Sequence, residues 1–98
     1  MKKTLFLTLK KEWFDKIKSG EKKEEYRDPS MWILSRLQTL DANGKRLVPI
    51  HYDTVTFQNG YRKEAPKIVV EYKGYDFRDD GIIVIKLGKV MKPPKSRG

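Results

Sequence analysis

The sequence predicts a small α+β domain built around a curled sheet, and three observations support this fold class. Leucine alternates with other residues over 4–9, as in a strand with one buried face. Residues 11–19 have the amphipathic spacing of a helix. Two later stretches, 68–72 and 82–87, are apolar and rich in β-branched residues, as buried strands are. Strands and helices mixed in one short chain pack as a sheet with helices against it.

The first two elements are predicted from their apolar patterns. The strand over 4–9 carries Phe6 on the face opposite its leucines, so we expect it to lie inside the sheet with both faces covered. The helix that follows presents Trp13 and Phe14 for packing against the sheet. Gly20 ends this helix, because glycine readily takes the left-handed conformation found at helix C-termini.

Residues 22–28 have two alternative predictions. Their glutamates and lysines favour a helix, but no apolar stripe continues past the glycine. As a strand, the segment has no apolar face and would be either an exposed, charged edge or the lining of a polar cleft. The next residues, Asp28-Pro29-Ser30, predict the start of a short second helix. We expect its Trp32 to pack in the core.

The remaining chain predicts mostly strands. Residues 41–45 have the composition of a turn, 53–58 read as a strand, and Asn59-Gly60 indicates a tight turn. The predicted order is strand, helix, strand, helix and then three strands. A chain of 98 residues is long enough for one domain, which we place at 1–90, followed by a basic and flexible tail at 91–98.

Composition excludes several functional classes. The chain has no cysteine, which excludes disulfides, a thiolate nucleophile and cysteine-bound zinc. His51 is the only histidine, so a multi-histidine metal site is excluded, and we expect this residue to lie in a loop or at a strand edge. We expect no metal and no cofactor. No apolar run has the length of a membrane span or the core of a signal peptide, so the sequence predicts a cytoplasmic protein.

The positive charge is concentrated toward the C-terminus. The formal net charge is +9, and the last thirteen residues carry five basic groups and no acidic group. A basic tail attracts any polyanion without specificity. The high net charge is therefore weak evidence for nucleic-acid binding by the folded domain.

The most informative segment is 20–27, which reads G-x-K-x-x-E-x-R directly after the first helix; we call it the signature segment. Glu25 and Arg27 are two residues apart, so on a strand they share a face and can form an ion pair. That pair can be purely structural, or it can serve a ligand site. Lys22 joins it only if this lysine lies in the turn after the glycine, because a regular strand would direct it to the opposite face.

These features together resemble the ASCH domain family of the PUA-like superfamily. The resemblance includes the signature segment, the preceding strand and helix, Thr56 to Tyr61, and the closing strand Ile85 to Gly88. It leaves mainly the loop 40–50 and the tail unassigned. It implies a small PUA-like β-barrel of about five mixed strands, with two helices covering one opening and a cleft floored by the signature segment.

The resemblance also implies a function. The family is generally regarded as RNA-binding, and some members are enzymes. One branch hydrolyses N4-acetylcytidine with a lysine, a threonine and a glutamate, and another is associated with RNA cleavage. Lys22 matches that lysine, but Glu25 stands where the threonine is expected, and a carboxylate does not replace a hydroxyl nucleophile unchanged. Glu71, on a later strand, is a conceivable partner acid.

The leading hypothesis is an RNA- or nucleotide-binding domain. Lys22 and Arg27 would contact phosphate or base, Glu25 would position them, and an aromatic residue beside cations in the loop after the third strand would form the opposite wall. The predicted ligand-binding residues are Gly20, Lys22, Glu25, Arg27, Asn59, Tyr61 and Arg62.

Two alternatives remain open. One is an enzyme on the same class of ligand, either a metal-independent ribonuclease or an amidohydrolase of a modified nucleoside, with Lys22 and Glu25 as catalytic residues. The other is a protein-interaction domain whose charge only keeps it soluble.

Overall fold

The computed structural model describes residues 3–91. In chain order its elements are β1 (Thr4–Leu9), α1 (Lys11–Lys18), β2 (Glu24–Arg27), α2 (Met31–Leu37), β3 (Gln38–Leu40), β4 (Leu47–Pro49), β5 (Thr54–Asn59), β6 (Lys67–Phe77) and β7 (Ile83–Val90). The predicted order of strands and helices is confirmed, and the sequence missed the pair β3 and β4.

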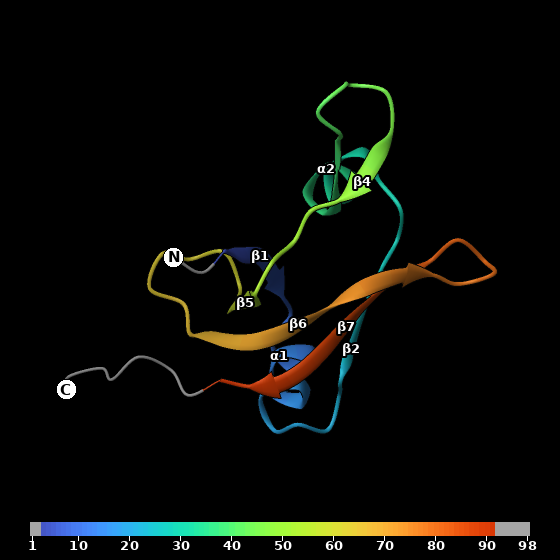
Figure 1. Cartoon of the computed structure of the whole chain (residues 1–98). Helices are drawn as coiled ribbons and strands as arrows, with labels where there is room; N and C mark the ends of the chain where they lie inside the picture. The colour runs from blue at the N-terminus through green and yellow to red at the C-terminus, as the bar shows by residue number, and fades with distance from the viewer. Residues whose placement is uncertain (1–2, 92–98) are drawn as a thin grey trace.

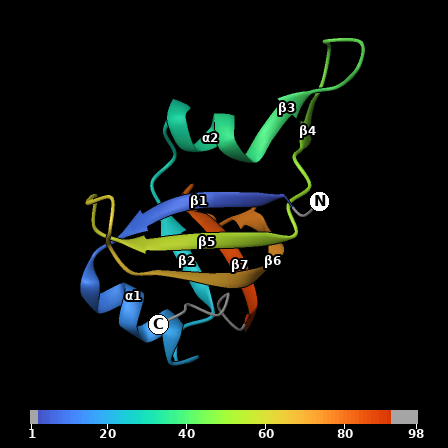
Figure 2. The ribbon, with the colours of Figure 1, turned by 90° about the vertical axis from the view of Figure 1, so that its left-hand side faces the viewer.

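Five of the strands form one mixed, curled sheet in the order β1-β5-β6-β7-β2 (Figure 1). β1 and β5 are parallel, and the other neighbours are antiparallel. The sheet curls into a half-barrel (Figure 2). In the strand order, β1 and β2 are its two edges. The predicted α+β class and the mixed sheet of about five strands are confirmed at this level of description.

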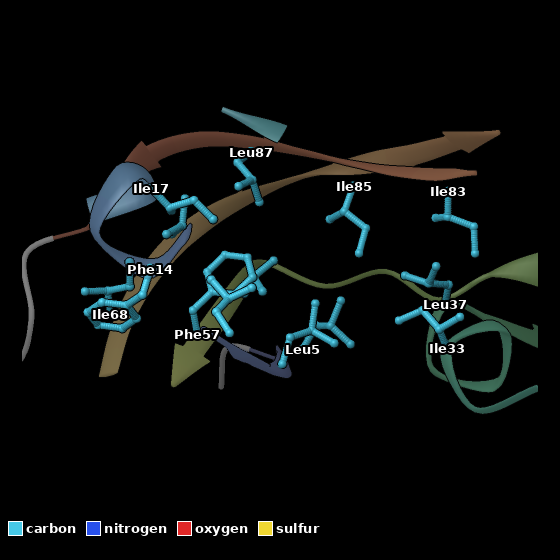
Figure 3. Packing of buried hydrophobic residues seen from close by; sticks show 14 residues of the cluster. Leu5, Phe14, Ile17, Ile33, Leu37, Phe57, Ile68, Ile83, Ile85 and Leu87 are labelled. Atoms are coloured by element: carbon cyan, nitrogen blue, oxygen red, sulfur yellow. The ribbon is translucent and has the colours of Figure 1, made fainter. Parts of the chain in front are cut away.

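The core fills the concave side of the sheet. Inward-facing residues of β1, β5, β6 and β7 meet there, and the ring of Phe57 is completely buried. Phe14 of α1 lies at one end of this core, whereas Ile33 and Leu37 of α2 lie at the other end (Figure 3). The two helices therefore close opposite ends of the core, which differs from the expectation that both cover one opening.

Two packing predictions were wrong. β1 lies at the edge of the sheet and not inside it, and Phe6, on its outer face, is 55% exposed. Trp32 of α2 is half exposed, because Ile33 and Leu37 supply the buried face of that helix. In both cases apolar character alone did not reveal which face the neighbouring elements cover.

α2 leads directly into a small projecting hairpin. Ser30 caps the helix by accepting the Ile33 N–H at its hydroxyl (3.2 Å), as the sequence predicted. β3 and β4 then pair around the predicted turn at 41–45, where the Gly44 N–H donates to the Asp41 carbonyl (2.9 Å). Strands of three residues have too few positions to show an alternating pattern, which is why the sequence did not predict them.

No helix within residues 3–91 is long and apolar enough to cross a membrane. The predicted basic tail falls outside the described residues, except for Met91.

Candidate functional site

The turn after α1 brings Lys22 to the start of β2. Gly20 has φ 86°, which favours glycine, and its N–H donates to the Ile17 carbonyl (3.0 Å). The Lys22 N–H then donates to the Lys16 carbonyl (3.0 Å), which folds the chain back beside the helix end. β2 begins only at Glu24. Lys22 therefore lies in the turn before the strand. This position meets the condition under which its side chain can join the pair formed by Glu25 and Arg27.

Glu25 and Arg27 form the predicted ion pair, and the pair lies on the inner face of the sheet. In the register with β7 they stand opposite Ile85 and Ile83, which are completely buried. The Arg27 Nε donates to Glu25 Oε2 at 2.8 Å, and Lys22 Nζ lies 3.9 Å from Glu25 Oε1. Glu25 is only 6% exposed, so its carboxylate is held between two cations at the margin of the core.

Arg27 also connects the two edges of the sheet. Its Nη2 donates to the carbonyl of Thr8 in β1 at 2.9 Å, while its Nε remains on Glu25 in β2. One guanidinium thus links both edge strands of the half-barrel through charge-assisted hydrogen bonds. These contacts favour the structural interpretation of Arg27 over its predicted role in binding phosphate or base.

The Lys22 ammonium group lies among aromatic rings. It donates a hydrogen bond to the Glu24 carbonyl, and it lies 4.4 Å from the ring centre of Tyr26 and 5.7 Å from that of Trp13. Its side chain is 15% exposed. Ring faces carry negative electrostatic potential, so both rings stabilise the charged lysine.

A cavity of about 300 Å³ opens at this point, lined by Trp13, Lys22, Glu25 and Tyr26; we call it the Lys22 cavity. Trp13 and Tyr26 are 39% and 46% exposed. The prediction that Trp13 only packs between helix and sheet was therefore wrong. Two accessible aromatic rings beside a cation and a carboxylate form a surface that suits a planar, polar ligand.

A larger cleft of about 810 Å³ shares Trp13, Lys22 and Tyr26 with the Lys22 cavity; we call it the lysine cleft. It is lined by five lysines and two glutamates, namely Lys16, Lys22, Lys23, Lys73, Lys86, Glu21 and Glu24. Three of these lysines have carboxylate partners that do not line the cleft, since Lys86 pairs with Asp76 (2.6 Å), Lys73 with Glu71 (3.6 Å) and Lys22 with Glu25 (3.9 Å). The excess of cations attracts anionic ligands.

Burial dominates the electrostatics of Glu25. Removal of the carboxyl group from water raises its pKa above the ordinary value of 4.5, although the nearby charges of Arg27 and Lys22 act in the opposite direction. Glu25 Oε2 is bonded to Arg27, whereas Oε1 faces Lys22 across a longer gap. A carboxyl group with these properties can exchange a proton at a pH closer to neutral than an exposed glutamate.

This pKa shift predicts a specific pH dependence of stability. The folded chain binds the Glu25 proton more tightly than the unfolded chain, and this tighter binding stabilises the fold. The stabilisation is complete below the pKa that Glu25 has in the unfolded chain, and it is lost as the pH rises through the pKa that Glu25 has in the folded chain. The variant Glu25→Gln lacks the titration. We expect the free energy of unfolding of the wild type, minus that of Glu25→Gln, to fall as the pH rises from about 4.5 toward 7. Urea unfolding of both proteins measures this difference, and a difference that rises with pH would contradict the burial of Glu25.

The structure does not bring all the predicted ligand-binding residues together. Asn59 ends β5, and Tyr61 and Arg62 lie in the loop after it; none of the three is among the residues that line the Lys22 cavity or the lysine cleft. Tyr61 is 90% exposed, and its predicted role in an opposite wall stays a prediction. Gly20 lines a neighbouring cleft of about 520 Å³, and the space around it is open, so its backbone conformation explains the glycine.

Two further residues considered from sequence lie elsewhere. Glu71 of β6 pairs with Lys73 and accepts the Lys89 N–H (3.2 Å), and these contacts lower its pKa. Its contacts are therefore with β6 and β7 residues and not with Lys22. His51 is exposed between β4 and β5, as expected. Among residues 3–91, no three His, Cys, Asp or Glu side chains gather as a metal site requires.

Sequence reasoning identified Lys22 but missed the other four lysines that line the cleft. Lys16 follows Trp13 by three residues on α1, and its Nζ lies 5.4 Å from that ring centre, so the helical spacing was a usable signal. Lys73 and Lys86 come from β6 and β7. Their proximity depends on the register of those strands, which has irregular shifts between Val70 and Tyr75 and which no local pattern reveals.

No protein-family model, no curated protein and no solved structure matches this chain.

Proposed function

We propose that this chain is an RNA- or nucleotide-binding domain of the ASCH type, with a PUA-like fold, and that its ligand occupies the Lys22 cavity and the lysine cleft. The observation that carries the proposal is the continuity of these two spaces, which share Trp13, Lys22 and Tyr26. An accessible aromatic surface that passes directly into a row of lysines suits a ligand with a flat base at one end and phosphate at the other.

The Lys22 cavity takes the base. Trp13 and Tyr26 each offer an accessible ring for stacking, and stacking on an aromatic ring stabilises any base by about 1–3 kcal/mol. Lys22 Nζ offers a donor and Glu25 Oε1 an acceptor, 3.9 Å apart. These two groups can therefore hydrogen-bond to a base edge that carries an acceptor beside an amino group.

The lysine cleft takes the phosphates. Among its lysines, Lys16 and Lys23 have no carboxylate within 4 Å in the described residues, so their charges are available to an anionic ligand. Phosphate contacts by lysine release counterions, so affinity should fall steeply as salt concentration rises. This salt dependence would come from the lysines of the folded domain, and it would add to any effect of the basic tail.

One observation favours catalysis as a second candidate function at the same site. Glu25 is a carboxyl group with a raised pKa beside a lysine, which is an arrangement found where a general acid or base acts. In that case Glu25 and Lys22 would exchange protons with an RNA phosphodiester or a modified nucleoside. A denaturing gel run after the anisotropy titration described below distinguishes RNA cleavage from binding alone.

The test is fluorescence anisotropy of a labelled single-stranded RNA with the full chain, comparing wild type, Lys22→Met and Lys45→Met. Methionine keeps the apolar stem of Lys22 against the rings and removes the charge. Lys45 is an exposed lysine in the β3–β4 turn, so its variant controls for the loss of one positive charge. We expect Lys22→Met to weaken binding about tenfold, roughly 1.4 kcal/mol, and Lys45→Met to leave it nearly unchanged. Equal affinities for the two variants would contradict the proposal.

A further inference from the structure

A further cleft lies beside the lysine cleft, at the C-terminal end of α1. It is the cleft of about 520 Å³ that Gly20 lines, and its opposite wall includes the end of β7; we call it the Lys89 cleft. Four lysines belong to its lining, and no acidic residue does. These lysines are Lys18, Lys22, Lys23 and Lys89. The Lys89 cleft is therefore positively charged and attracts anions.

Most of this charge has no carboxylate partner in the described part of the chain. Within residues 3–91, the Nζ atoms of Lys18, Lys23 and Lys89 have no carboxylate oxygen within 4 Å, and all three residues are exposed. Glu71 accepts the Lys89 N–H (3.2 Å), but its carboxylate pairs with Lys73. The helix dipole favours a cation in the last turn of α1, which accounts for Lys18. Lys89 belongs to β7, so the dipole does not account for it.

The Lys89 cleft is continuous with the site already described. Lys22 lines the Lys22 cavity, the lysine cleft and the Lys89 cleft, and Lys23 lines both clefts. On α1, Lys16 lines the lysine cleft and Lys18 lines the Lys89 cleft, on either side of the buried Ile17. The three spaces therefore form one surface that passes round the C-terminal end of α1, with lysines along both clefts.

We propose that the ligand of this surface is a single strand of RNA several nucleotides long, and not a free nucleotide. This inference rests on the proposed function, which places a base in the Lys22 cavity and its phosphate in the lysine cleft. The strand would continue round the end of α1, with its next phosphates at Lys18 and Lys89. An RNA strand carries one negative charge per nucleotide along its length, so it matches a row of lysines, whereas the phosphates of a free nucleotide lie close together.

Other ligands of the same chemistry fit less well. A pocket of about 300–1,000 Å³ holds one small ligand, and the lysine cleft alone, at about 810 Å³, is within that range. A free nucleotide would therefore leave the Lys89 cleft empty. The bases of a duplex are stacked on one another, so they could not stack on Trp13 and Tyr26 in the Lys22 cavity.

The test is anisotropy of a labelled single-stranded RNA of about ten nucleotides in random sequence, a length typical of single-strand binding sites. Wild type is compared with Lys18→Met/Lys89→Met. The matched control is Lys10→Met/Lys45→Met, which removes two exposed lysines that line none of the three spaces. We expect Lys18→Met/Lys89→Met to bind about tenfold more weakly, and its plot of log affinity against log salt concentration to be shallower by about 1.4, or about 0.7 per lost phosphate contact. The control should change neither quantity.

Competition experiments distinguish a strand from a free nucleotide. A mixture of the four nucleoside monophosphates and triphosphates should displace the labelled RNA from the wild type at least tenfold less well than unlabelled RNA does. Equal competition, or equal RNA affinities of Lys18→Met/Lys89→Met and the control, would overturn this inference and leave the proposed function standing. If the wild type binds neither the RNA nor the nucleotides, the proposed function fails and this inference fails with it.

Discussion

Replacement of Arg27 by alanine is expected to lower the free energy of unfolding by about 3 kcal/mol, which is a large fraction of the stability of a small domain. Glu25 is only 6% exposed, and Arg27→Ala removes the cation that lies 2.8 Å from its carboxylate. It also removes the hydrogen bond to the Thr8 carbonyl that joins the two edge strands. Lys22, 3.9 Å from Glu25, compensates only in part. Urea unfolding at neutral pH measures the effect.

The loss of stability in Arg27→Ala should come mostly from the unpaired Glu25 carboxylate, and two controls test that explanation. The double variant Glu25→Met/Arg27→Met removes both charges and keeps two unbranched side chains, so its stability should be much closer to that of the wild type. The cost of Arg27→Ala alone should also decrease at lower pH, because the loss of Arg27 raises the pKa of Glu25 further and the neutral carboxyl tolerates burial. A double variant as unstable as the single one would contradict this account.

Replacement of Trp13 by alanine is expected to produce the largest loss of ligand affinity. Trp13 lines both the Lys22 cavity and the lysine cleft, and loss of one stacking ring costs about 1–3 kcal/mol, or roughly fivefold to 150-fold in Kd. The conservative Trp13→Phe keeps a ring and should bind nearly as well as the wild type. Anisotropy with the same RNA measures the affinities of the wild type, Trp13→Ala and Trp13→Phe.

Trp32 provides the matched control for this prediction. It is the only other tryptophan in the chain, it is half exposed, and it lies on α2 at the far end of the core from α1. Trp32→Ala should leave RNA affinity unchanged. If Trp32→Ala weakens binding as much as Trp13→Ala, the RNA does not lie in the Lys22 cavity.

The sequence predicted the elements whose patterns are local. The alternating leucines of β1 gave that strand its correct bounds, Gly20 marked the end of α1, and Ser30 marked the start of α2. The pairing of Glu25 with Arg27 followed from two-residue spacing on a strand. Each of these features depends on residues a few positions apart, so no tertiary information was needed.

Features that depend on the folded chain were not predictable in this way. The edge position of β1 is set by which strands pair with it, and its own pattern does not reveal this. The exposure of Trp13 depends on how α1 lies against the sheet, and the lysine cleft depends on the register of β6 and β7. Tyr61 was expected in the site because of its neighbours in sequence, yet it lines neither space there.

RNA or a nucleotide is proposed to bind in the Lys22 cavity, and the two tryptophans allow a direct test of this proposal. The ¹⁵N-labelled chain of 98 residues gives two indole N–H signals, from Trp13 and Trp32, which the Trp13→Phe variant assigns. The measurement is the shift of both signals during titration with a short single-stranded RNA. We predict that the Trp13 signal moves with the bound fraction while the Trp32 signal stays in place. A shift of Trp32 alone, or of neither signal at saturation, would contradict the claim.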